Sequence, residues 1–388
     1  MKKHASWQPD ATQELLLKAA LMPPEAAVDC WQRWQGRTDI EKLDYASFRL
    51  LPLLYKNLQS AGIEGTALVR YRSVYRHFWY KNKLYLHRLG GFLERYNQTG
   101  AELPLLLKGV PLILNYYSDP GLRPMADIDI LIREDDLQVA FATLQESGWV
   151  AEKQLPDRTT SLWLLAEREC HFRNREGMEI DLHWNLLQES FLGKDEINAC
   201  IGRGREVTIS AGMALIPDAT DLFYHVLSHG VRWNSVHPLR WIPDVKVILE
   251  RDGGRIEWNR IIDMARRDHL GLRLKRAIQY LSVLGMGNLI PAVSRRIMVN
   301  LEYENWEIPE FWFTSHRNEI WGDFPELCFQ AYRYSRKSSG WGKCCGDFIK
   351  FILCRWHVHS LYLLPLEIMR RLRRRFMALM KRFSVLFS

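Results

Sequence analysis

The chain lacks the marks of an exported or disulfide-stabilised protein. Its seven cysteines are scattered over 388 residues and form no CxxC pair. This pattern argues against a disulfide framework or a structural zinc cluster and is typical of a reducing compartment. Residues 1–26 contain no long apolar run and no small-residue cleavage site, so they do not resemble a signal peptide. We therefore expect a cytoplasmic protein.

The body of the protein also lacks a large excess of charge. The formal net charge is +8, but residues 369–388 contain seven Lys and Arg and no acid, so the remainder is nearly neutral. A general nucleic-acid-binding surface is therefore not predicted, and nucleic acid is not an expected partner.

The basic tail carries an apolar stripe at three- and four-residue steps, formed by Leu372, Phe376, Leu379, Phe383 and Leu386. A basic amphipathic helix of this type can lie on an anionic membrane surface. One interpretation is therefore peripheral attachment to the inner face of the membrane through residues 369–388. The alternative is a helix that packs on the protein body or on a second subunit.

The periodicity of apolar residues predicts an α+β protein. Spacing of three and four residues predicts helices at both ends of the chain, whereas short apolar runs, alternating segments and Gly-containing turns predict strands between them. We predict four parts: a helical region at 1–98, an α+β core with a small mixed sheet at 99–212, a helical domain at 213–345, and apolar followed by basic amphipathic helices at 346–388.

Within the core, the order of elements can be read from the sequence. A buried strand is predicted in LPLLLKG (103–109), a helix over 110–119, a second strand in ADIDILI (126–132), and an amphipathic helix over 134–148. The runs ERECHFRN and MEIDLHWNL flank a short turn at 175–177, which predicts a hairpin.

Two carboxylates stand out because Asp127 and Asp129 are predicted on the same face of one strand. Neighbouring buried carboxylates repel each other and lose hydration, and a bound cation relieves both effects. Asp181 in the hairpin provides a third acid. Three such carboxylates are typical of a Mg²⁺ site for phosphoryl transfer.

A structural role is the alternative for this group. Asp127 would then accept loop N–H groups or pair with Lys108, while Asp129 would pair with Arg123 or Arg133.

Other acids and histidines are competing candidates. Glu179 shares a face with Asp181 and His183 in the second arm of the hairpin, so Glu179 is the alternative third carboxylate. His183 either orients the acceptor or is a buried structural histidine, and His171 on the first arm is interpreted as structural.

Two further groups lie in the C-terminal helical part. His225 and His229 have a spacing that zinc sites use, with Asp221 one turn earlier, but no HExxH motif accompanies them. Arg240 and Asp244 are either contacts of the site or a surface charge and a helix cap.

The segments LLLKGVPLILNYYSDPGLRPMADIDILI and EIDLHWNLL resemble the uncharacterised nucleotidyltransferases, a branch of the DNA polymerase β-like nucleotidyltransferase superfamily. The resemblance covers about residues 100–250. It implies that Asp127 and Asp129 are the metal-binding pair and that Asp181 is the third carboxylate. The fold it implies is a small mixed-sheet nucleotidyltransferase core between helical regions.

The resemblance also implies a phosphate-binding turn, in which Gly109 matches the loop glycine and Lys108 precedes it. We expect Lys108, Gly109 and Arg123 to contact the nucleotide. One departure is that Val110 stands where the superfamily usually has a serine. Lys108, the helix start at Val110 or Arg123 would replace that missing contact.

The function implied is Mg²⁺-dependent transfer of an NMP, AMP by default, from an NTP to an unidentified acceptor hydroxyl with release of pyrophosphate. Two Mg²⁺ ions are expected on the catalytic residues Asp127, Asp129 and Asp181, with Asp181 also acting as general base. The alternative is a catalytically inactive nucleotidyltransferase-fold module with a binding or regulatory role.

Overall fold

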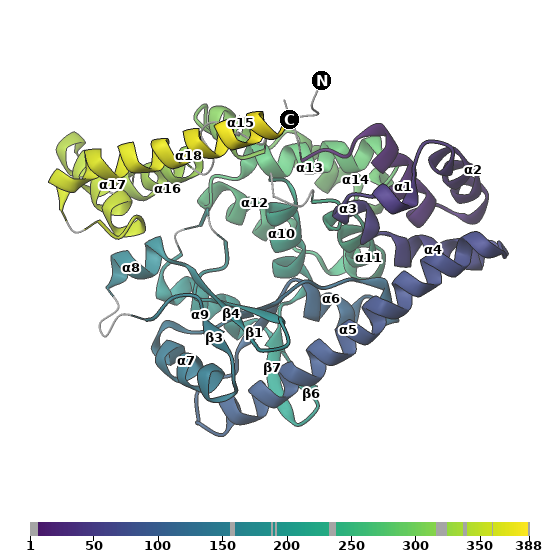
Figure 1. Cartoon of the computed structure of the whole chain (residues 1–388), viewed down its shortest axis with the longest axis horizontal. Helices are drawn as coiled ribbons and strands as arrows, with labels where there is room; N and C mark the ends of the chain where they lie inside the picture. Colours follow the sequence, from purple (N-terminus) through teal and green to yellow (C-terminus); the bar gives the residue numbers. More distant parts are fainter. Residues whose placement is uncertain are drawn as a thin grey trace. The chain divides into compact units, whose positions relative to one another are not determined.

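The computed structural model describes residues 7–155, 160–187, 189–190, 192–232, 238–315, 324–336, 340–358 and 360–386. The chain divides into two compact units (Figure 1). Unit 1 comprises Met1–Leu155 and Glu169–His316, and unit 2 comprises Pro156–Arg168 and Arg317–Ser388. The predicted α+β class, with helical regions at both ends of the chain, is confirmed.

In the described part of unit 1, the strands form one mixed sheet in the order β3-β4-β5-β2-β1-β7-β6. The strands are β1 (Leu105–Leu107), β2 (Ile128–Leu131), β3 (Val150–Ala151), β4 (Glu169–Arg173), β5 (Glu179–His183), β6 (Arg205–Ile209) and β7 (Gly212–Ile216). At the centre, β2 pairs in parallel with β5 and antiparallel with β1.

Helices precede, interrupt and follow this sheet in unit 1. The first group is α1 (Ala11–Leu21), α2 (Pro24–Gln35), α3 (Tyr45–Phe48), α4 (Leu51–Ser60) and α5 (Thr66–Asn97). Those between strands are α6 (Gly109–Asn115), α7 (Leu137–Glu146) and α9 (Lys194–Gly202). The last group is α10 (Ala219–Gly230), α11 (Trp241–Asp252), α12 (Trp258–Arg267), α13 (Gly271–Val283), α14 (Ala292–Val299) and α15 (Glu307–Ser315).

Unit 2 is helical where it is described, with α8 (Ser161–Ala166), α16 (Phe324–Ser335), α17 (Trp341–Arg355) and α18 (Leu364–Leu386). Glu167 links two of its segments, because it accepts a hydrogen bond from Arg355 at 2.8 Å. Among the described residues, no helix is long and apolar enough to cross a bilayer. The side chains of Phe376, Leu379, Phe383 and Leu386 in the predicted apolar stripe lie outside the described part, whereas Leu372 is exposed.

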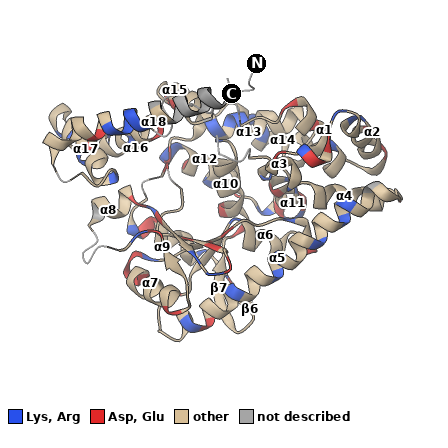
Figure 2. Cartoon of the chain, in the orientation of Figure 1, with Lys and Arg blue, Asp and Glu red and all other residues tan. Residues whose placement is uncertain are grey.

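The alternation of residues along β4 and β5 explains the two faces of the sheet. Ile180 and Phe172 are register partners on the apolar face, and Phe172 meets Phe141 of α7 with ring centroids 4.9 Å apart. The opposite face carries acidic side chains, and Figure 2 shows acidic residues along these strands. Sheet alternation therefore separates the hydrophobic core from a charged face.

The predicted hairpin is present, with its turn at the expected place. The side-chain oxygen of Asn174 accepts from the backbone N–H groups of Glu176 at 3.0 Å and Met178 at 2.9 Å, and Gly177 adopts a positive φ of 76°. A left-handed residue at this point favours glycine. The second predicted strand is shorter than expected, so Asp127 lies immediately before β2.

Candidate active site

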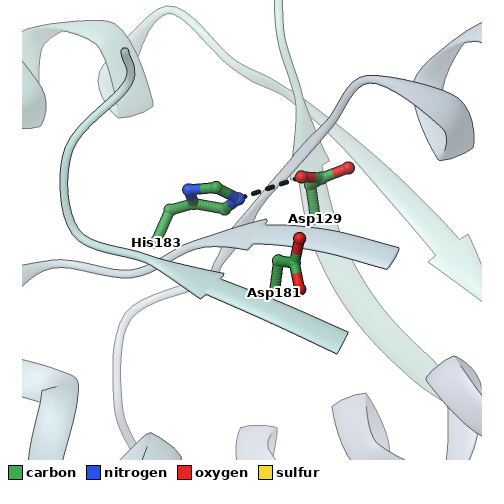
Figure 3. A group of neighbouring side chains, drawn as sticks. All are labelled: Asp129, Asp181 and His183. Carbon is green, nitrogen blue, oxygen red and sulfur yellow. Dashed lines mark hydrogen bonds and ion pairs between the residues drawn. The ribbon is translucent and has the colours of Figure 1, made fainter. Parts of the chain in front are cut away.

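The central strand pairing brings acids from distant parts of the sequence together. Asp129 of β2 is the register partner of Asp181 of β5, and the two strands run in parallel. Register partners point to the same face of a sheet, and His183 follows on that face two residues after Asp181. Figure 3 shows the His183 ring directed at Asp129, with Asp181 on the neighbouring strand.

Asp129 is almost completely buried, with 1% of its surface exposed. Its carboxylate accepts hydrogen bonds from the Lys108 ammonium and from Nε2 of His183, the latter at 2.9 Å. Burial opposes ionisation of Asp129, but these two cations lower its pKa far below the ordinary value. Asp129 is therefore ionised at neutral pH.

His183 bridges two carboxylates. Its Nδ1 lies 3.2 Å from Oε2 of Glu169, while Nε2 faces Asp129. Burial opposes protonation of His183, but hydrogen bonds to Asp129 and Glu169 raise its pKa to about 9. In this arrangement the ring is an imidazolium that donates from both nitrogens. His183 is thus part of the charged network rather than an isolated buried histidine.

Lys108 and Gly109 form a tight turn between β1 and α6. Lys108 has a φ of 49°, and burial opposes its charge, yet Asp129 raises its pKa. A Cβ at Gly109 would lie 2.8 Å from Sδ of Met125 and 3.1 Å from Nη1 of Arg123. Because Gly109 has no side chain, the loop before β2, which carries Arg123 and Met125, can approach the backbone of the turn at Gly109 closely.

Asp181 and Glu179 have different surroundings. Asp181 accepts a hydrogen bond from Nδ1 of His171 at 2.6 Å, and this bond raises the pKa of His171 to about 9. Glu179 is more exposed and pairs with Arg173. The register match with Asp129 favours Asp181 as the third carboxylate.

Asp127 is the acid without a partner. It is half-buried, and within the described residues its carboxylate makes no hydrogen bond or ion pair. Burial raises its pKa, and the negative charge of Asp129 raises it further. Such a carboxylate is stabilised by an added cation.

Arg123 has a strong structural partner. Its Nε and Nη2 donate to the two carboxylate oxygens of Asp244 at 3.2 and 2.8 Å, and the hydroxyl of Tyr117 donates to the same carboxylate at 2.8 Å. Arg133 lies 3.9 Å from Glu102. The alternative in which Asp129 pairs with Arg123 or Arg133 is therefore wrong. Asp129 pairs with Lys108 instead.

The donor set fits a divalent cation. Carboxylate oxygens of Asp129 and Asp181 lie, together with a ring nitrogen of His183, within 4.8 Å of one another. The His183 nitrogen can act as a ligand only when the ring is neutral, so the two carboxylates are the ligands in the protonated arrangement described above. Carboxylate oxygens are the ligands that Mg²⁺ prefers. Asp127 lies outside this group, although its charge affects the pKa values of Lys108 and Arg240.

The suggested zinc spacing on α10 does not form a metal-ligand group in the described part of the chain. Asp221 accepts a hydrogen bond from Arg203 at 2.9 Å. His225 stacks on His229 with ring centroids 6.0 Å apart, and neither nitrogen of His225 has a hydrogen-bond partner in the described residues.

Sequence reasoning missed Glu169. Glu169 and His171 alternate along β4 and are the register partners of His183 and Asp181. The alternation within ERECHFRN was the available signal, because it places both residues on the face that carries the acids.

Comparison with protein families gives a match that covers more than half of the chain. The profile of a family described as uncharacterised nucleotidyltransferase matches residues 45–284, which include the whole charged network and extend on both sides of the predicted core. A search of curated proteins found no match.

Proposed function

Because the chain belongs to the uncharacterised nucleotidyltransferase family and is therefore a transferase, we propose that it moves an NMP from an NTP to an acceptor hydroxyl and releases pyrophosphate. AMP is the proposed group and ATP the proposed donor. The observation that carries the proposal is the in-register pair Asp129 and Asp181 on adjacent strands. This pair supplies two carboxylates on one face, as metal-assisted phosphoryl transfer requires.

Asp127, Asp129 and Asp181 are the proposed Mg²⁺ ligands, with His183 adjacent. When bound, Mg²⁺ would lower the pKa of the attacking hydroxyl and neutralise charge on the leaving pyrophosphate. Lys108 and His183 keep Asp129 ionised at neutral pH.

Asp181 is the proposed general base for the acceptor hydroxyl. Among the described residues, only its Oδ1 takes part in a hydrogen bond, which comes from His171. That bond fixes the orientation of the carboxylate, and the other oxygen remains available for the acceptor proton. Lys108, Gly109 and Arg123 stay the proposed nucleotide contacts.

The test begins with calorimetric titration of ATP, and then the other NTPs, with and without Mg²⁺. We expect Mg²⁺-dependent binding that Asp129→Asn and Asp181→Asn each abolish, together with pyrophosphate release once an acceptor is supplied. Glu179→Gln is the matched control, because Glu179 lies on the same face but pairs with Arg173. Equal NTP binding by wild type and Asp129→Asn would contradict the proposal. Binding without pyrophosphate release across an acceptor screen would favour the inactive binding module.

We also propose that the C-terminal helix binds an anionic membrane surface. Unit 2 exposes apolar side chains on the first turns of α18, including Leu366, Met369 and Leu372. Co-sedimentation with phosphatidylserine-containing vesicles should be lost when residues 369–388 are removed and should weaken in high salt. Equal sedimentation of the shortened chain would refute this role.

A further inference from the structure

Three basic side chains near Asp127 have no carboxylate partner among the described residues. They are Arg49, Lys81 and Arg240, and their pKa values are all lowered, mainly by burial. Arg49 is only 6% exposed, and its Nε has no hydrogen-bond partner in the described structure. A buried guanidinium without a counter-ion is costly, which indicates that an anion completes its surroundings.

The first two cations are brought together by packing on α5. Arg49 directly follows α3, whose Phe48 meets Phe78 of α5 with ring centroids 5.9 Å apart. Lys81 lies one helical turn beyond Phe78 on α5. The guanidinium of Arg49 also lies 4.8 Å from the centre of the Tyr45 ring, which holds it in place.

The third cation comes from the other side of the same loop. Arg240, at the start of α11, donates to the backbone carbonyl of Pro124. Asn82 and Tyr85 of α5 hold this loop through the carbonyls of Arg123 at 2.8 Å and Ala126 at 2.6 Å. The loop leads directly to Asp127, whose charge raises the pKa of all three cations.

The neighbouring cations are already neutralised. Lys108 is paired with Asp129, and Arg123 is paired with Asp244 through two hydrogen bonds. In the described part of the chain, three positive charges are therefore close enough to be influenced by Asp127, whose carboxylate is unpaired there, and this excess of positive charge suits a multiply charged anion. Guanidinium groups present several N–H donors in a plane that matches phosphate oxygens.

We propose that Arg49, Lys81 and Arg240 form a polyphosphate subsite beside Asp127, which binds the β- and γ-phosphates of the nucleotide. This inference rests on the proposed nucleotidyl transfer. It places the phosphate contacts on α5 and on residues bordering α3 and α11, outside the turn at Lys108 and Gly109.

The test is calorimetric titration of inorganic tripolyphosphate into the full chain in the presence of EDTA. Wild type should bind, and Lys81→Gln and Arg240→Gln should each weaken binding about tenfold or more, because each loses a charge-assisted hydrogen bond. Lys83→Gln is the matched control, since Lys83 is exposed on the same helix and lies over the ring of Trp79. It should change the affinity less than about twofold. Arg49→Lys, which keeps the charge, should also weaken binding, because an ammonium lacks the planar set of N–H donors that matches phosphate oxygens.

A second comparison separates this subsite from the metal site. Asp127→Asn should tighten metal-free tripolyphosphate binding, because it removes a negative charge that is unpaired within the described residues and lies beside the three cations. Asp129→Asn should abolish Mg²⁺-dependent NTP binding and leave tripolyphosphate binding in place. If transfer activity is never found but these tripolyphosphate results hold, the proposed function fails and the subsite stands.

The competitor identifies the source of the phosphates. Metal-free ATP should displace tripolyphosphate, and a sugar monophosphate should not. Displacement by the sugar monophosphate alone would assign the subsite to a phosphorylated acceptor and overturn the inference. Absence of wild-type binding would overturn it too, as would equal affinities for Lys81→Gln, Arg240→Gln and Lys83→Gln.

Discussion

Replacing Asp244 by Asn tests whether the buried pair with Arg123 stabilises the fold. The two side chains are 3% and 9% exposed, and the change removes the charge that compensates the guanidinium. Removing one partner of a buried ion pair costs about 3–5 kcal/mol. We expect the lower end, about 3 kcal/mol, because the amide oxygen of Asn still accepts one hydrogen bond.

Urea unfolding followed by circular dichroism measures this cost, through a lower midpoint at an unchanged slope. Glu250→Gln is the control on the same helix, since Glu250 makes an exposed ion pair with Lys246 and should lose less than about 1 kcal/mol. The double variant Arg123→Met with Asp244→Leu should be more stable than Asp244→Asn, because it leaves no unpaired buried charge. If Asp244→Asn costs no more than Glu250→Gln, the reasoning is refuted.

Two further predictions concern stability. Gly90→Ala should destabilise by about 1–3 kcal/mol, because its Cβ would lie 2.8 Å from Cβ of Ser210 and 2.9 Å from the Ile209 carbonyl oxygen. A Cβ at Gly91 would have no neighbour within 4 Å, so Gly91→Ala should stabilise α5 by about 1 kcal/mol. Chemical denaturation of both variants measures the difference between them, and equal effects on stability would contradict the prediction. Burial lowers the pKa of His225 from 6.5 to about 3, so the unfolded chain binds a proton that the folded chain excludes. The contribution of neutral His225 to the free energy of unfolding is therefore complete above pH 6.5. It declines as the pH falls from 6.5 toward 3, by on the order of 1.4 kcal/mol per pH unit. His225→Leu should flatten the measured stability-against-pH curve by this amount, and parallel curves would argue against it.

Local patterns were sufficient to predict the strands that carry the acids. The alternation in ADIDILI and MEIDLHWNL reflects one apolar and one polar face, and the glycine in the turn between the two hairpin arms allows a positive φ. These are short-range properties, so one sequence reveals them.

The partner of each side chain could not be predicted in the same way. Lys108 contacts Asp129 rather than Asp127, and His183 spans Asp129 and Glu169, because strand register decides which groups meet. The strands β6 and β7 were not predicted either. β7 pairs with β1 across a long sequence separation, and a local pattern does not reveal such a pairing. Arg49 reaches the same region only through helix packing, which a linear pattern does not encode.

The parallel register of β2 and β5 also restricts how the length of this chain can vary. A one-residue insertion after Ile180 would shift the following side chains by one position and turn those of Asp181 and His183 away from Asp129. An insertion in the turn at 174–177 would leave both strands aligned. Length changes should therefore be tolerated at the tip of this hairpin and rejected within its second strand, which an insertion library scored for Mg²⁺-dependent NTP binding would reveal.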